Sequence, residues 1–377
     1  MLTTAATSPE APLVGRHPKS WAVRAFPDFK GDHREFDRAA LGLLCMWTLW
    51  KEKSLASLGG GESPIWRDAL VKTLSVPGGF EALAYAILFN DLGKLDATVK
   101  AIKKAGRDAP ADHDEALSLA LRVAPKQVAP GFSKLQGSWG DIWLTGLDSG
   151  FNVGMAARME LPRAGWGKWL TLSEDQRAFH ALHSYFDMLG SGGAEDPTKL
   201  APAMGSRATS AICALACFGE SAESFESEVM LRFGWECDWR PALAMARLCG
   251  ASAVNGPERV KAILDEMSFE HRDAIDWGLG EKACVAWQYA PAVLSASGQQ
   301  GLGALIGQEG ARGLVALAEA FAQLRATIPE GTEKAMGRGV GVANLREMAA
   351  MRKGGDENWS KPGIWVGAVG GWTWAPA

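Results

Sequence analysis

The sequence predicts an all-α protein. Apolar residues recur at helical spacing through successive segments, and Gly, Asn or Pro separates these segments. Neither a convincing hairpin signal nor an alternation of strands with helices occurs. Of the 377 residues, 47% are hydrophobic and 22% are charged, which is typical of a globular protein and not of a disordered or fibrous one. The net charge of −4 excludes a generally basic nucleic-acid binder.

The first helices follow an N-terminal arm. Residues 1–30 are polar and contain several prolines, so we expect an arm there. From Arg34 to Leu58 the apolar positions follow helical spacing, and three glycines then end the run. Pro64 opens a short helix at the position that proline favours. Further helices are expected at Glu81–Phe89, Asp96–Ala105 and Asp112–Val123.

The clearest helix runs from Ser173 to Leu189. Ser173 can cap it, acidic residues occupy its first turn, and Gly190 follows its last turn. Later helices are expected at 206–218, 240–250, 257–267, 281–294 and 311–326, and a short extended piece at Gly363–Ala377. We therefore expect three parts: the arm at 1–30, a helical core at 31–200 that carries the site, and a C-terminal helical region at 201–377 packed on that core.

The sequence also favours a cytoplasmic location. No apolar run approaches the roughly 18 residues needed to span a bilayer, so no membrane partner is expected. The N-terminus lacks the charged and apolar regions of a secretory signal. The six cysteines lie in apolar surroundings, which favours reduced, buried thiols.

Tryptophan is unusually common, with 16 residues against three tyrosines. Several tryptophans form pairs three or four residues apart, and this spacing places the two indoles of a pair on one face of a helix. Core packing is the favoured interpretation, and stacking platforms for an aromatic substrate are the alternative. Trp166 and Trp169 lie among glycines and are expected to be the most exposed.

The polar residues that suggest chemistry begin at the end of an apolar helix. Asn90 and Asp91 follow Phe89, and then Gly93 permits a turn before Lys94. Two adjacent polar side chains in such a place need partners, or they form a turn and cap the next helix.

Two further clusters follow along the chain. His113 stands beside Asp114 in the first turn of a helix, where acids are favoured by the helix dipole and flanking carboxylates raise the basicity of an imidazole. His180, His183 and Asp187 share one helix face, where they could meet a metal or a phosphate, or be hydrogen-bonded core residues. Between these clusters, the glycine-rich stretch around Asn152 allows close approach to a ligand or forms a plain connection.

Taken in order, these motifs resemble the HD-domain superfamily of helical metal-dependent phosphohydrolases over about residues 80–190. That resemblance implies an HD-like bundle. Where the family has a His–Asp pair, this chain has Asn90 and Asp91, and asparagine is a poor ligand for transition metals. Two alternatives follow: a phosphohydrolase for a nucleotide or phospho-compound, or an inactive scaffold that binds a ligand or partner. In the first, the metal ligands would be Asp91, His113, His183 and Asp187.

A closer resemblance is to fungal arginine-containing cyclodipeptide synthases. It rests on Phe89–Lys94, Asp112–Asp114, Pro130–Phe132, Gly146-Leu147, Phe151–Gly154, Glu160-x-Pro162 and His183–Asp187. The chain departs from the family at Met155 and Arg158, where glutamines are expected.

This resemblance implies formation of a cyclic dipeptide from arginyl-tRNA and a second aminoacyl-tRNA, without a metal or other cofactor. The catalytic residues it implies are His113, His183, Asp91 and Asp187, with Asn90, Lys94, Asp114, Asn152 and Glu160 binding substrate. Either histidine would be the general base, and the carboxylates of Asp91, Asp114 and Asp187 would accept a guanidinium or amine.

Two stretches of the chain are basic although the whole is acidic. Lys94–Lys134 has a net charge of +3 and Lys334–Lys353 a net charge of +4. Each could contact the phosphates of tRNA, or be a solvated helix face.

Overall fold

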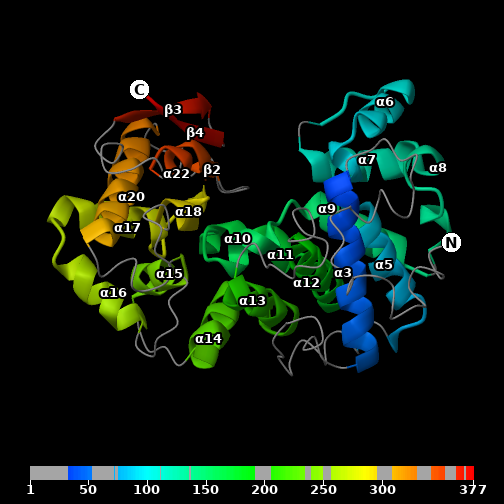
Figure 1. The fold of residues 1–377 in the computed structure, drawn as a ribbon, viewed down its shortest axis with the longest axis horizontal. Helices are drawn as coiled ribbons and strands as arrows, with labels where there is room; N and C mark the ends of the chain where they lie inside the picture. Colours follow the sequence, from blue (N-terminus) through cyan, green and yellow to red (C-terminus); the bar gives the residue numbers. More distant parts are fainter. Residues whose placement is uncertain are drawn as a thin grey trace, which may run out of the picture. The chain divides into compact units, whose positions relative to one another are not determined.

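The computed structural model describes residues 33–52, 72, 75–110, 112–135, 137–191, 205–233, 239–248, 256–294, 308–328, 341–352, 362–368 and 371–377. Within these ranges the fold is mainly helical, as the sequence predicts, with one four-stranded sheet (Figure 1). The chain forms two compact units. Unit 1 contains residues 1–153 and 172–219, and unit 2 contains residues 154–171 and 220–377. The expected arm at 1–30 and the helix at Pro64 lie outside the described residues.

Unit 1 is entirely helical in its described part. Its α-helices confirm the predicted positions to within one or two residues where both are defined, and short 3₁₀ turns connect some of them. The elements are α3 (His33–Glu52), α5 (Gly79–Phe89), η2 (Asn90–Lys94), α6 (Asp96–Lys104), α7 (His113–Val123), α8 (Pro125–Val128), η3 (Phe132–Lys134), α9 (Trp139–Ser149), α12 (Glu174–Gly190) and α13 (Gly205–Phe218).

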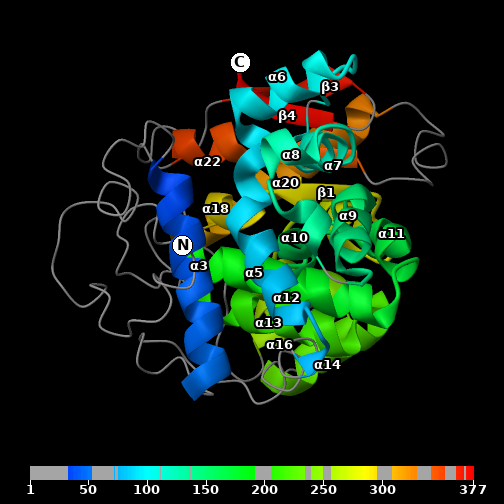
Figure 2. The same cartoon turned by 90° about the vertical axis from the view of Figure 1, so that its right-hand side faces the viewer.

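Helix α12 is the centre of unit 1 and packs against α3, α5, α9 and α13 (Figure 2). Ser173 caps it as predicted: its hydroxyl accepts from the backbone N–H of Gln176, whose side chain accepts from the Ser173 backbone in return. Phe179, Leu182 and Phe186 are fully buried on the helix. The core of unit 1 therefore surrounds the helix that carries His183 and Asp187.

Helices α3 and α12 cross so closely that their backbones touch. A Cβ at Gly190 would lie 2.2 Å from the carbonyl oxygen of Arg38, and one at Gly42 would lie 2.9 Å from the carbonyl oxygen of Phe186. Only glycine fits at these two positions without a shift of the helices. The close crossing brings Arg38 of α3 next to Asp187 of α12.

Unit 2 combines helices with the sheet. Its elements are α10 (Val153–Ala157), which begins at the boundary, η4 (Arg163–Trp166), α11 (Gly167–Leu170), α14 (Ala222–Phe233), α15 (Arg240–Leu248), α16 (Gly256–Asp265), α17 (Phe269–Leu279), β1 (Val285–Gln288), α18 (Ala290–Leu294), α20 (Gln308–Thr327), β2 (Gly341–Asn344), α22 (Arg346–Arg352), β3 (Gly363–Ala368) and β4 (Gly371–Pro376).

The sheet has the strand order β1-β2-β4-β3, in which β1, β2 and β4 are parallel and β3 is antiparallel to β4. The predicted helix at 281–294 is therefore wrong over 281–289, where Val285–Gln288 form β1, and only Ala290–Leu294 are helical, as α18. A short apolar run that is buried on both faces cannot be distinguished from a helix by periodicity, and Val285, Ala286 and Trp287 are all buried. The extended piece expected at the C-terminus is present as the β3–β4 hairpin.

Tryptophans of the described residues pack in the cores of both units. In unit 2 the fully buried Trp287 lies 3.9 Å from Phe321 between ring centroids, and Trp277 and Trp365 surround it at 6.0 and 6.1 Å. The expectation that Trp166 and Trp169 are exposed is wrong, since they are 2% and 0% exposed. Glycine-rich context led to the error: the segment folds as η4 and α11 and turns both indoles inward.

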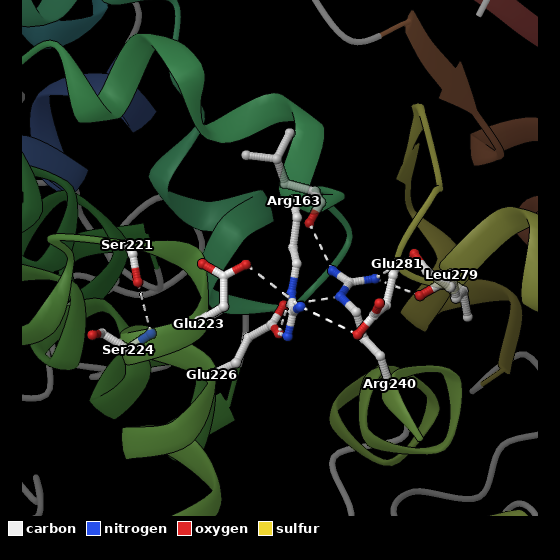
Figure 3. A network of polar contacts seen from close by, with 10 residues as sticks. Arg163, Ser221, Glu223, Ser224, Glu226, Arg240, Leu279 and Glu281 are labelled. Atoms are coloured by element: carbon white, nitrogen blue, oxygen red, sulfur yellow. Dashed lines mark hydrogen bonds and ion pairs between the residues drawn. The ribbon is translucent and has the colours of Figure 1, made fainter. Parts of the chain in front are cut away.

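Unit 2 also contains a buried network of ion pairs (Figure 3). Glu226, which is 3% exposed, accepts from Nε of Arg240 at 2.9 Å and from Nη2 of Arg163 at 2.6 Å. Arg240 also donates to the carbonyl oxygens of Leu161 and Leu279. Glu226 therefore joins the 154–171 segment to α14 and α15.

Two smaller findings concern membrane-spanning helices and the exposure of the cysteines. No helix in the described part of the chain is both long and apolar enough to cross a membrane. Among the described cysteines, Cys45 is buried as expected, whereas Cys217 is exposed.

Candidate functional site

Unit 1 brings three of the predicted stretches into one group of charged side chains, which we call the carboxylate cluster. Its members come from four elements and are Arg38, Asp91, Lys94, His113, Asp114, His183 and Asp187. Gly93 makes the convergence possible, because a Cβ there would lie 1.8 Å from the carbonyl oxygen of His113. The turn η2 can therefore lie directly on the start of α7.

Arg38 bridges the two most buried carboxylates of the cluster. Its Nη2 forms an ion pair with Asp187, and its Nη1 lies 3.6 Å from Oδ2 of Asp91. Lys94 contacts the other oxygen of Asp91 at 2.6 Å. The side chains of Asp91, Asp187 and Arg38 are only 14%, 17% and 20% exposed, so these contacts are shielded from solvent. Burial and repulsion from Asp91 raise the pKa of Asp187, while Arg38 opposes the rise.

His183 is a buried, neutral imidazole at the inner side of the cluster. It is 5% exposed and hydrogen-bonded to the backbone of Ala86, and its Nε2 has no hydrogen-bond partner among the described residues. Burial lowers the pKa of His183 to about 4, although the carboxylates of Asp114 and Asp91 pull it upward. The bond to Ala86 fixes the orientation of the ring.

His113 and Asp114 form the accessible side of the cluster. His113 Nε2 lies 3.4 Å from Asp114 Oδ1, and the two side chains are 43% and 44% exposed. Asp112 caps α7 by accepting from the backbone N–H of Asp114 at 2.9 Å, which fixes the start of the helix. Partial burial raises the pKa of Asp114, and the nearby His113 opposes this. A ligand can reach this pair from solvent.

The remaining predicted residues have other surroundings. His180 shares α12 with His183 but packs against α9, where Gly146 lies beneath its ring. Asn90 begins η2 and is partly buried, and Asn152 is exposed just before α10. Glu160 belongs to unit 2, where it is 1% exposed and bound by Arg158 at 2.7 Å. Burial raises the pKa of Glu160, and the arginine opposes this.

Sequence reasoning missed Arg38. It belongs to no recognisable motif. A single arginine on an amphipathic helix is normally expected on the solvent-exposed face. The available signal was indirect: Gly42, four residues later, and Gly190, three residues after Asp187, mark the close helix crossing.

The described residues do not fit the metal centre that the HD-type resemblance implies. They contain no group of three or more His, Cys, Asp or Glu side chains arranged to hold a metal ion. Arg38 and Lys94 contact the carboxylates that such an ion would need, and Asn90 stands where the family has histidine.

Comparison with protein-family models, curated proteins and solved structures found no match in any of the three. The chemistry open to the site therefore follows from its own side chains. They provide a guanidinium held between two carboxylates, a buried neutral imidazole, and a half-exposed His–Asp pair.

Proposed function

We propose that this chain forms an arginine-containing cyclic dipeptide from aminoacyl-tRNAs, with the carboxylate cluster as its active site. The observation that carries the proposal is the half-exposed pair of His113 and Asp114 at the edge of the cluster, because it holds an imidazole and a carboxylate 3.4 Å apart where a substrate can reach both. Asp114, half-exposed at the edge of the same cluster, is the carboxylate that a substrate guanidinium or amine can reach.

The geometry favours particular roles among the sequence-based assignments. Asp91 and Asp187 hold Arg38, so they shape the pocket and leave Asp114 as the acceptor of the substrate cation. His113 is half-exposed and is the general base, whereas Nε2 of His183 is closed to solvent. His183 is therefore a positioning residue. Lys94, 36% exposed, orients the ester carbonyl from the edge of the cluster.

The proposed reaction needs two acyl transfers and no oxidant or reductant. The α-amine of one aminoacyl ester attacks the carbonyl carbon of the other, so that a C–N bond forms and an ester C–O bond breaks. His113 takes the proton from the amine, and the departing 3′-oxygen of the tRNA receives one. The remaining amine then attacks the second ester in the same way and closes the six-membered ring.

The surface of α6 supports a tRNA partner. Lys100, Lys103 and Lys104 are exposed on this helix, and Arg107 is exposed just after it. Basic side chains along one helix suit the phosphates of a nucleic acid even on an acidic protein. Because charged tRNA is the substrate, the proposed reaction takes place in the cytoplasm.

The test is expression in a bacterium and mass spectrometry of the medium. We expect a diketopiperazine that contains arginine, and heavy-isotope arginine in the medium should shift its mass. Asp114→Asn and His113→Ala should each reduce the product by about 100-fold, the usual effect of losing a general base or a charged contact. Glu174→Gln, on the exposed start of α12, is the matched control and should leave the yield unchanged.

A second candidate, an inactive ligand-binding scaffold, is favoured by the internal pairing of Arg38. Soluble protein without any diketopiperazine would support this candidate and reject the synthase. Under the scaffold hypothesis, alanine at Asp91 or His183 would lower stability and change no activity.

A further inference from the structure

We propose that unit 2 carries a second ligand site, which binds the phosphate group of a small molecule through Arg158, Tyr289 and Arg346. All three residues belong to unit 2, whereas the carboxylate cluster belongs to unit 1. Arg158 stands where the cyclodipeptide synthase resemblance expects a glutamine, so the resemblance does not imply this site. Phosphate binding by unit 2 does not depend on the reaction proposed above.

The ends of two neighbouring parallel strands bring Tyr289 and Arg346 to one edge of the sheet. Gln288, the last residue of β1, pairs with Asn344, the last residue of β2. Tyr289 follows the first strand directly, and Arg346 lies two residues beyond the end of the second. The backbone N–H of Leu345 donates to the carbonyl oxygen of Gln288 at 3.0 Å, so the two strand ends stay joined where α18 and α22 begin. Ligands of open α/β sheets commonly bind at the carboxyl ends of the strands.

Arg158 is held at the same edge by Glu160. The backbone N–H of Trp287 donates to the carbonyl oxygen of Glu160 at 3.0 Å, which aligns this segment with β1, the first strand in the order of the sheet. The carboxylate of Glu160 is buried and lies close to the backbone N–H of Tyr289. It accepts from Nη2 of Arg158 at 2.7 Å. Glu160 therefore positions one side of the guanidinium beside the end of β1.

Each of the three side chains keeps a donor for a ligand. Arg158 is 25% exposed, and because its Nη2 is bound by Glu160 and its Nε is buried, Nη1 is the nitrogen that a ligand can reach. The hydroxyl of Tyr289 and the guanidinium of Arg346 are exposed and make no hydrogen bond or ion pair with other described residues. The acidic neighbours are Glu160, which is paired with Arg158, and the exposed Glu347 on α22. Two guanidinium groups and a hydroxyl suit the several oxygens of a phosphate.

The backbone around Glu160 is strained. Met159 and Tyr289 are the two non-glycine residues with a positive φ in the described part of the chain, at 60° and 69°. Met159 directly precedes Glu160, and the N–H of Tyr289 lies close to the carboxylate of Glu160. Such conformations cost free energy, and they concentrate at ligand-binding and catalytic sites. The strained residues therefore flank the acid that positions Arg158, as expected of a binding site.

The test is titration of the purified full-length chain with inorganic phosphate at constant ionic strength, followed by phosphorus NMR and calorimetry. We expect the wild type to bind about one equivalent, and Arg158→Gln and Arg346→Gln each to bind at least about tenfold more weakly, because each loses a charge-assisted contact. Tyr289→Phe removes only the hydroxyl and should weaken binding about threefold. Arg259→Gln removes an exposed arginine from α16 of the same unit and is the matched control, with phosphate binding equal to wild type.

Circular dichroism establishes that each variant is folded. Arg346 is exposed, so Arg346→Gln provides the test even if loss of the Arg158–Glu160 ion pair unfolds Arg158→Gln. The proposal is overturned if the wild type does not bind phosphate, or if either arginine variant is folded and binds phosphate as tightly as the wild type.

Two further titrations distinguish the source of the anion. Acetate should bind at least about tenfold more weakly than phosphate, because it carries a single charge. Equal binding of acetate would assign the site to carboxylates and overturn the choice of phosphate. Displacement of bound phosphate by tRNA at the same ionic strength would assign the two arginines to an RNA backbone and overturn the small-molecule ligand.

Discussion

The ring of His180 lies directly over Gly146, so that a Cβ on this glycine would be 0.7 Å from Nε2 of the imidazole. Gly146 is inside α9, where glycine lowers helix stability relative to alanine. It is tolerated because the space of its missing side chain is filled by an imidazole from α12. The contact packs α9 tightly against α12, the helix that carries His183 and Asp187. It therefore helps to fix the position of two members of the carboxylate cluster.

Substitution of Gly146 should therefore strongly destabilise unit 1. We expect Gly146→Ala to lower the free energy of unfolding by about 3 kcal/mol, at the upper end of the overpacking range, because His180 must leave its place. Urea denaturation measures the change. Gly140→Ala, on the same helix, is the control: its Cβ would meet Phe132 at an ordinary 3.4 Å, and we expect no loss of stability. Equal stability of the two variants would contradict the contact.

Stability should fall as the pH is lowered from 7 to 5. Burial lowers the pKa of His180 to about 3 and that of His183 to about 4, from an unfolded value of 6.5. Below pH 6.5 the unfolded state binds two protons that the native state does not, so their uptake favours unfolding. Each histidine contributes up to about 1.4 kcal/mol per pH unit in this range.

The raised pKa values of Asp187, Asp114 and Glu160 act in the opposite direction, since the native state binds their protons first. Their effect lies between the unfolded carboxyl values of 3.8 to 4.5 and the raised native values, whereas the effect of the histidines begins at pH 6.5 and continues down to about pH 4. Removal of the two histidines therefore isolates their share of the slope. Free energies of unfolding from denaturant titrations across this range measure the slope. The double variant His180→Gln/His183→Gln should flatten it, and an unchanged slope in that variant would exclude the two histidines as its cause.

The ion-pair network of unit 2 predicts a large difference between two neighbouring glutamates. Glu226→Gln should lower the stability by about 3–5 kcal/mol, because it removes the charge that balances the buried Arg240 and the partly exposed Arg163. Glu223 also contacts Arg163, at 3.5 Å, but is 61% exposed, so Glu223→Gln should change stability by no more than about 0.5 kcal/mol. Thermal unfolding of both variants measures this difference. If the two variants lose similar stability, burial does not determine how much each ion pair contributes to the free energy of unfolding.

Sequence reasoning succeeded where local chemistry decides the structure. Apolar spacing and end signals predicted many of the helices but not α9, α14 and α17, and the cap at Ser173 is present as a full capping box. The positions of Asp91, Asp114, His183 and Asp187 within one cluster were also anticipated from the motifs.

It failed where contacts between distant residues decide. The pairing of β1 with β2 joins strands more than 50 residues apart, and four-residue strands carry no periodicity of their own. The ion pair of Arg38 with Asp187 spans 149 positions, and only the two glycines of the helix crossing, Gly42 and Gly190, point to it indirectly. The separation of Glu160 into unit 2 likewise depends on its burial beside Arg158 and on the bond from the Trp287 N–H to its carbonyl.

The most direct test of the proposed function uses purified components. The full-length chain is incubated with radiolabelled arginyl-tRNA and a mixture of the other aminoacyl-tRNAs, in the presence of a metal chelator, and the products are separated by chromatography. We expect a labelled cyclic dipeptide from the wild type, and at least about 100-fold less from Asp114→Asn. Recovery of the label only as arginyl-tRNA and free arginine, with folded protein present, would contradict the account.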